Sequence, residues 1–158
     1  MNYKEEFIQY IVVRRDLVEQ MGPGKLAAQC CHASLGVLLT KKKYYKDYAG
    51  RIISPFDDGY SFSGPYVEKV ELIDDEATTK WINSRFTKLV CGIRNKEKLL
   101  NLAEKLDNDG IRYKLIFDAC FTKLSAEESD GSCLTCLGII PINRNDVPKY
   151  LHKLQLLD

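Results

Sequence analysis

The segment Met21–Ala33 constrains the fold more than any other part of this 158-residue chain. It opens with a Gly-Pro-Gly turn and continues into a helix built mostly from Leu, Ala and Cys. Lys25, Gln29 and His32 occupy positions i, i+4 and i+7, so at about 100° per residue they fall within about 60° of one another. A single polar stripe is an unusual feature of a core helix and a reasonable basis for a functional site.

The rest of the chain alternates segments with strand and helix patterns. Phe7–Arg14 is β-branched and aromatic over strand length and predicts a buried first strand. The helix with the polar stripe is expected to run from about Lys25 to about Tyr45. Asn95 and Gly110 frame an amphipathic helix whose leucines repeat on one face. Further strands are expected at 87–94, 111–117 and 132–140, helices at 74–83, 96–109 and 143–151, and an edge strand at 154–157.

Helices that join successive strands favour parallel pairing, whereas a loop alone separates the third and fourth strands and permits an antiparallel pair. We therefore predict an α/β fold, a three-layer α/β/α domain with a small mixed four-stranded sheet. The length allows one domain, residues 1–158. Residues 44–83 are expected to be an insert, because 48–69 is rich in Gly, Pro and aromatic residues without helical periodicity. These aromatic side chains could pack on the domain, on a second subunit or on nucleobases.

Composition narrows the function classes. The net charge is +1, so any interaction with nucleic acid must come from a local patch of charge. No apolar run approaches the roughly 18 residues needed to span a bilayer. The first residues lack the apolar segment of a signal peptide. We therefore expect a cytoplasmic protein with no membrane partner.

The six cysteines favour burial over metal binding. Without a secretory signal a disulfide framework is not expected. Cys133 and Cys136 could supply half of a zinc site, but no second pair has suitable spacing. They also lie in a β-like run, where residues three apart should face opposite sides of the strand. We expect buried thiols, no metal and no cofactor, with metal or redox use as the alternative.

A second group of polar residues is expected to meet the stripe. Sites in open α/β sheets gather beyond the carboxyl ends of the strands. Asp118 ends the third strand, and Thr122 follows in the next loop. The turn at 22–24 places Lys25 at a helix N-terminus, where a cation costs about 0.3–1 kcal/mol. Its presence there indicates use in an anion site.

The glycines of the turn do not form a P-loop. That motif needs Gly at position 19 and a hydroxyl at position 26, where Glu19 and Leu26 stand. Nucleotide hydrolysis is therefore disfavoured. His32 lies beside two cysteines and fits a structural role as well as a catalytic one. His152 is expected at the surface.

Basic residues offer a local surface for phosphate. Lys41, Lys42 and Lys43 fall in the expected last turns of the helix, where they are either a solvated helix end or a patch that contacts phosphate. Lys88 opens the second strand. We take Lys41, Lys42 and Lys88 as candidate substrate contacts, with Tyr44 beside them available for stacking.

Several segments together resemble the type II peptidyl-tRNA hydrolases. The resemblance covers nearly the whole chain except roughly 44–83. It also extends to a divergent branch, the peptidyl-tRNA hydrolase domain-containing proteins. The segments that carry it are 9–17, 21–33, 88–94, 99–110, 118–122 and 135–141, among them Gly-Lys-Leu-Ala-Ala-Gln-Cys-Cys-His and Asp-Ala-Cys-Phe-Thr.

The resemblance implies an enzyme that hydrolyses the ester between a peptide and the 3′-terminal ribose of tRNA. It implies a mixed four-stranded sheet between helices, a homodimer and no metal. The family's functional positions match Lys25, Gln29, His32, Asp118, Thr122 and Thr135. Ester hydrolysis needs a positioned water, stabilisation of an oxyanion and a proton for the departing ribose oxygen, which these residue types can supply.

The chain also departs from the family pattern. Cys120 and Lys123 replace a usual Gly and Gln. The loop from Thr122 to Thr135 is longer and holds acidic residues, which should repel phosphate. Two further readings are therefore a non-catalytic relative that binds tRNA or a protein through the same cleft, and a different hydrolase on this scaffold.

Overall fold

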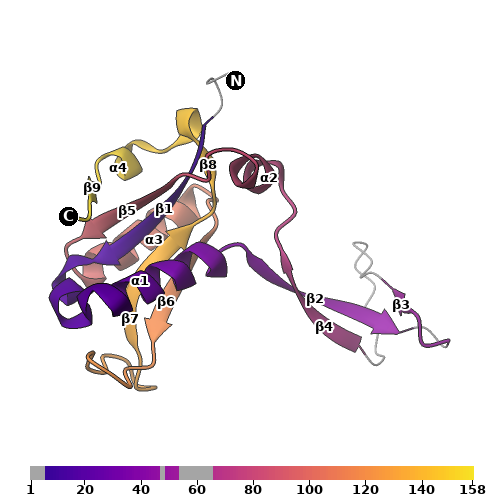
Figure 1. Ribbon diagram of the computed structural model, residues 1–158, viewed down its shortest axis with the longest axis horizontal. Helices are drawn as coiled ribbons and strands as arrows, with labels where there is room; N and C mark the ends of the chain where they lie inside the picture. Colours follow the sequence, from indigo (N-terminus) through magenta and orange to yellow (C-terminus); the bar gives the residue numbers. More distant parts are fainter. Residues whose placement is uncertain (1–5, 47–48, 54–65) are drawn as a thin grey trace. The chain divides into compact units, whose positions relative to one another are not determined.

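The computed structural model describes residues 6–46, 49–53 and 66–158 (Figure 1). The chain divides into two compact units. One is Leu39–Ile73, and the other comprises the segments before and after it.

The larger unit is built on a mixed sheet. Its strand order is β6-β7-β1-β5-β9, and β8 pairs with β1. β1 and β5 are parallel, whereas β7 is antiparallel to both β1 and β6. The strands are β1 (Phe7–Arg14), β5 (Lys88–Ile93), β6 (Tyr113–Asp118), β7 (Cys133–Ile139), β8 (Ile142–Asn143) and β9 (Gln155–Leu156). The four long strands are those predicted, and the antiparallel pair of β6 and β7 is confirmed. The sheet has six strands rather than four, because β8 and β9 each add two residues.

One helix covers each face of this sheet, α1 (Val18–Gly36) and α3 (Lys96–Asn108), as Figure 1 shows. Alternate residues of β1 point to opposite faces. Ile8, Tyr10 and Val12 therefore pack in one core with the leucines of α3. Ile11 and Val13 pack in a second core with residues of α1. The predicted three-layer arrangement is confirmed.

α1 lies unusually close to β7. A side chain at Gly138 would place its Cβ 2.1 Å from the carbonyl oxygen of Ala33. Only glycine permits this approach. α1 also breaks at Gly22, whose φ of 67° is left-handed, and Pro23 then opens the longer part of the helix. The turn expected before Lys25 is therefore present.

The helix ends at Gly36, so its predicted extension to Tyr45 is wrong. Leu39–Lys46 forms β2, which pairs with β4 (Tyr66–Leu72) and with β3 (Ile52–Ile53). The lysines that looked like a helix end lie on this strand. Cross-strand partners such as Tyr45 with Tyr66 stabilise the pairing, which local sequence could not reveal. The predicted long loop at 48–69 is also wrong at β3 and from Tyr66 onward. Its residues 48 and 54–65 lie outside the described residues.

The shorter helices follow their caps. α2 (Glu76–Ile82) begins where the Asp75 side chain accepts a hydrogen bond from the Thr78 N–H at 2.8 Å, and Trp81 is fully buried. The predicted helix at 143–151 is instead a 3-10 turn, η2 (Arg144–Asp146), followed by α4 (Lys149–His152). Pro148 separates the two, because proline cannot continue a helix. The expected edge strand near the C-terminus is β9.

Candidate active site

A bulge in β7 shapes the floor of the site. Ile116 pairs with Cys136 and Phe117 pairs with Leu134, so Thr135 is an extra residue on β7. Cys133 and Cys136 therefore pack on the same side of the sheet, with α1, which corrects the expectation that they face opposite sides. The bulge also directs the fully buried Thr135 toward α1.

Lys25 and Asp118 form the central ion pair. Lys25 Nζ lies 2.9 Å from Asp118 Oδ1, and both side chains are only 13% exposed. The same ammonium donates a hydrogen bond to the Thr122 carbonyl oxygen at 2.7 Å and lies 3.4 Å from Thr122 Oγ1. Lys25 thus joins the start of α1 to the carboxyl end of β6 and to the loop beyond it.

Gln29 connects this pair to the sheet. Its side chain is buried. Gln29 Nε2 donates to Asp118 Oδ2 at 3.0 Å, and Gln29 Oε1 accepts from Thr135 Oγ1 at 2.7 Å. A carboxylate only accepts hydrogen bonds, so Asp118 fixes the amide with Nε2 toward itself. Gln29 Oε1 then faces the Thr135 hydroxyl, which also lies 3.2 Å from the Ile116 carbonyl oxygen. A continuous chain of contacts runs from Thr135 through Gln29 and Asp118 to Lys25.

Asp118 is held as a carboxylate. Burial acts to raise its pKa, but the hydrogen bond and charge of Lys25, the Cys120 N–H at 2.8 Å and the charge of His32 together bring the pKa below its ordinary value. The group is therefore ionised at neutral pH. It accepts hydrogen bonds and does not donate them.

The segment after Asp118 folds back over the start of α1. Cys120 and Lys123 both have left-handed φ values, 58° and 64°. Lys123 Nζ donates to the Met21 carbonyl oxygen at 3.3 Å. Phe121 is 93% exposed. These residues were not predicted as site residues; the departures from the family pattern at 120 and 123 were the available signal.

Two acids of the loop after Thr122 form ion pairs with basic residues from other parts of the protein. Glu127 accepts two hydrogen bonds, at 2.6 and 2.9 Å, from the buried guanidinium of Arg14. Arg14 holds the pKa of Glu127 below its ordinary range. Glu128 pairs with Lys96. Part of the negative charge expected to repel phosphate is thus neutralised within the protein.

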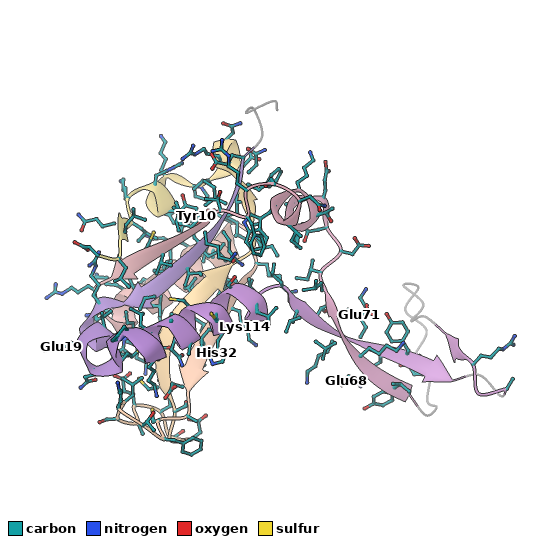
Figure 2. The ribbon with its side chains drawn as sticks, in the orientation of Figure 1. Tyr10, Glu19, His32, Glu68, Glu71 and Lys114 are labelled. Carbon is teal, nitrogen blue, oxygen red and sulfur yellow. The ribbon has the colours of Figure 1, made fainter. Side chains whose placement is uncertain are left out.

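His32 lies at the margin of the site. It is exposed on α1, on the side where β6 lies (Figure 2). Its charge contributes to the lowered pKa of Asp118, so it is close to the carboxylate. No hydrogen bond of the His32 ring is present within the described part of the chain.

The three other lysines predicted to bind substrate lie elsewhere. Lys88 Nζ sits 3.2 Å from the centre of the Phe86 ring and 4.7 Å from that of Trp81. Burial lowers its pKa. Lys41 and Lys42 belong to the smaller unit, where they pair with Glu68 and Glu71 of β4 at 3.2 and 3.4 Å; Figure 2 marks both acids. The structure therefore brings together Lys25, Gln29, Asp118, Thr122 and Thr135 but does not join these lysines to them.

Residues 6–46, 49–53 and 66–158 contain neither a metal-binding cluster nor a membrane-spanning helix. No group of three or more His, Cys, Asp or Glu residues there could hold a metal ion. No helix in those ranges is both long and apolar enough to cross a membrane.

Comparison with known proteins identifies the family. The model of the family described as "Peptidyl-tRNA hydrolase PTH2" matches residues 7–157. The chain belongs to this family. The matched residues include Lys25, Gln29, Asp118 and Thr135 and extend across both compact units.

Curated relatives named peptidyl-tRNA hydrolase agree. The proteins of Methanopyrus kandleri and Methanococcus vannielii are 32% and 30% identical to this chain over 149 residues. Each alignment covers 94% of this chain and 97% of the relative. A third, from Saccharolobus solfataricus, is 24% identical over 147 residues.

Cys120 adopts a conformation that suits glycine. Its left-handed φ of 58° is one that glycine, the residue expected here from the family resemblance, adopts without strain. This turn brings the Cys120 N–H within 2.8 Å of Asp118 Oδ1.

Proposed function

We propose that this protein hydrolyses the ester bond of peptidyl-tRNA and releases free tRNA and peptide. The observation that carries the proposal is the chain of contacts from Thr135 to Lys25, which holds an ionised Asp118 at the carboxyl edge of the sheet. Full-length similarity to proteins named peptidyl-tRNA hydrolase supports the choice of substrate.

Asp118 is suited to orienting the attacking water. A carboxylate offers about four acceptor positions. Oδ1 accepts from Lys25 and from the Cys120 N–H, and Oδ2 accepts from Gln29. Within the described residues this leaves one position on Oδ2 for a water. Because its lowered pKa makes Asp118 a weak base, its main contribution is to hold that water in line with the ester carbonyl.

Lys25 is suited to the charge that develops during attack. An ammonium has three donors, and Asp118 Oδ1 and the Thr122 carbonyl engage two of them. The third can donate to the carbonyl oxygen of the ester as it becomes an oxyanion. The water oxygen bonds to the carbonyl carbon, the bond to the ribose oxygen breaks, and a proton from the water ends on that ribose oxygen, directly or through the Thr122 hydroxyl.

The partners are part of the proposal. The substrate brings tRNA as a binding partner, and the lysines at 41, 42 and 88 are proposed to contact it. We also propose a single domain over 1–158 with an insert at 44–83, a homodimer as in the resemblance, a cytoplasmic location and a role for His32 next to the carboxylate.

The test is release of tRNA from an N-blocked aminoacyl-tRNA such as diacetyl-lysyl-tRNA. Asp118→Asn removes the charge but keeps the shape, and kcat should fall about 10²- to 10⁴-fold. Asp74→Asn, which changes an exposed carboxylate before α2, is the matched control and should retain full activity. Binding of the substrate without turnover by the unaltered protein would instead favour the non-catalytic reading.

A further inference from the structure

A basic cleft lies outside the active site. A cavity of about 930 Å³ opens between α3, α4 and the carboxyl end of β5. Five of its lining residues are cations, and one is an acid: Arg15, Arg94, Lys98, Lys105 and Lys153, with Glu104. The lining includes none of the active-site residues Lys25, Gln29, Asp118, Thr122 and Thr135.

Positive charge exceeds negative charge in this cleft. Three further acids lie beside it, since Asp158 is 3.3 Å from Arg15, Glu97 is 3.7 Å from Lys98, and Asp109 accepts a hydrogen bond from the lining residue Tyr150 at 2.7 Å. Arg94 and Lys153 take part in no ion pair with the described residues. In a chain whose net charge is only +1, this is a local concentration of positive charge of the kind that attracts a polyanion.

The cleft and the active site share one edge of the sheet. β5 is parallel to β1, and β6 runs in the same direction because both β1 and β6 are antiparallel to β7. Arg94 therefore follows β5 at the same edge where Asp118 ends β6, an arrangement that can be followed in Figure 1. Arg15 follows β1 between them. Three strand spacings separate β6 from β5, which is about 14 Å. The cleft lies on the face of the sheet that α3 covers, whereas the active site lies on the face that α1 covers, so the two meet only at this edge.

We propose that this cleft binds the phosphodiester backbone of the tRNA part of the substrate, a few nucleotides from the scissile ester. A strand of a nucleic-acid duplex advances about 3.4 Å per nucleotide, so about four nucleotides cover the distance along the edge of the sheet, and the backbone then passes over this edge to the face that α3 covers. Arginine binds phosphate through paired N–H groups, and Lys153 supplies a second positive charge in the lining of the cleft. The inference rests on the proposed function for the identity of the RNA.

The test is the double substitution Arg94→Gln/Lys153→Gln. Each lost phosphate contact should weaken binding of deacylated tRNA roughly fivefold at about 0.15 M salt, and the two together about 25-fold. The dependence of log Kd on log salt should become shallower by about one to two. KM for diacetyl-lysyl-tRNA should rise while kcat stays unchanged, because neither residue touches the ester.

Lys149→Gln is the matched control, since Lys149 is exposed on α4, the short helix that precedes Lys153, and does not line the cleft. It should leave Kd, KM and kcat unchanged. Equal tRNA affinity in the double variant and in this control would overturn the proposal, as would a fall in kcat with constant KM. Loss of binding to a mononucleotide with tRNA affinity preserved would also overturn it. If the unaltered protein binds tRNA through the cleft but leaves the ester intact, the proposed activity fails while the binding inference stands.

Discussion

Replacing Lys25 by methionine removes the ammonium group while keeping a side chain of similar length. In the unaltered protein the Asp118 carboxylate is stabilised by Lys25 at 2.9 Å, and its pKa lies below the ordinary value. Without Lys25, fewer groups oppose the effect of burial, so the pKa of Asp118 rises above its value in the unaltered protein. The substitution should therefore cost more stability at neutral pH than in acid.

The size of the effect follows from the geometry. A hydrogen bond to a charged group contributes about 1.5–3 kcal/mol, and both side chains are shielded from water. A lowered pKa gives the folded unaltered protein stability that is present above the unfolded pKa of about 3.9 and is lost as pH falls. In Lys25→Met the higher pKa of Asp118 reduces this contribution, and the reduction is largest at neutral pH and smallest in acid. The free-energy difference should grow from acid to neutral pH by up to about 1.4 kcal/mol per pH unit between the two pKa values.

Urea unfolding at several pH values from about 4 to 7.5 measures this difference. The lost bond to the Thr122 carbonyl contributes a part that does not depend on pH. Combining Lys25→Met with Asp118→Asn should remove the pH-dependent part and show a coupling above about 0.5 kcal/mol in a double-mutant cycle. A difference that is constant with pH, or a coupling near zero, would refute the view that this ion pair sets the state of Asp118.

Three further substitutions test the surroundings of the site. Thr135→Val removes the donor to Gln29 Oε1, so kcat should fall with KM unchanged and stability should drop by about 1 kcal/mol; an unchanged kcat would contradict a role for this contact. Cys120→Gly should be about 1 kcal/mol more stable to urea than Cys120→Ala, because only glycine relieves the left-handed φ, and equal stabilities would contradict this. Glu127→Gln leaves the buried Arg14 with Asp16 as its remaining charged partner and should destabilise by about 1–3 kcal/mol at pH 7; because the pKa of Glu127 is lowered, the difference should vanish in acid, and persistence there would argue against the ion pair.

Most of the larger unit could be predicted from local patterns. Phe7–Arg14 is too apolar for anything but a central strand, and the leucines between Asn95 and Gly110 repeat with helical period. The end of the first helix at Gly36 and the strand that follows it could not be predicted. Lys41–Tyr45 is compatible with a helix end and becomes a strand only through its pairing with β4. That partner is distant in sequence, and its pairing has no local signal.

The candidate site also has some residues that local sequence predicts and others that it does not. Lys25 and Gln29 follow from helical spacing, and Asp118 follows from its position after a strand. The bulge at Thr135 could not be predicted, because it depends on how β7 pairs with β6. Without the bulge a strict alternation separates the faces of Cys133 and Cys136, and the hydrogen bond from Thr135 to Gln29 cannot be foreseen.

The close approach at Gly138 has a consequence for engineering this protein. Main-chain atoms of α1 rest on β7 at this point, about one helical turn from Gln29, so the spacing between helix and strand is set by backbone contact and not by the sizes of core side chains. Many apolar residues on the face of the sheet that α1 covers could therefore be replaced in a stabilised variant without losing the contact from Gln29 to Thr135. Replacement of Gly138 by alanine would push the helix away and lengthen that contact even where the new core packs well.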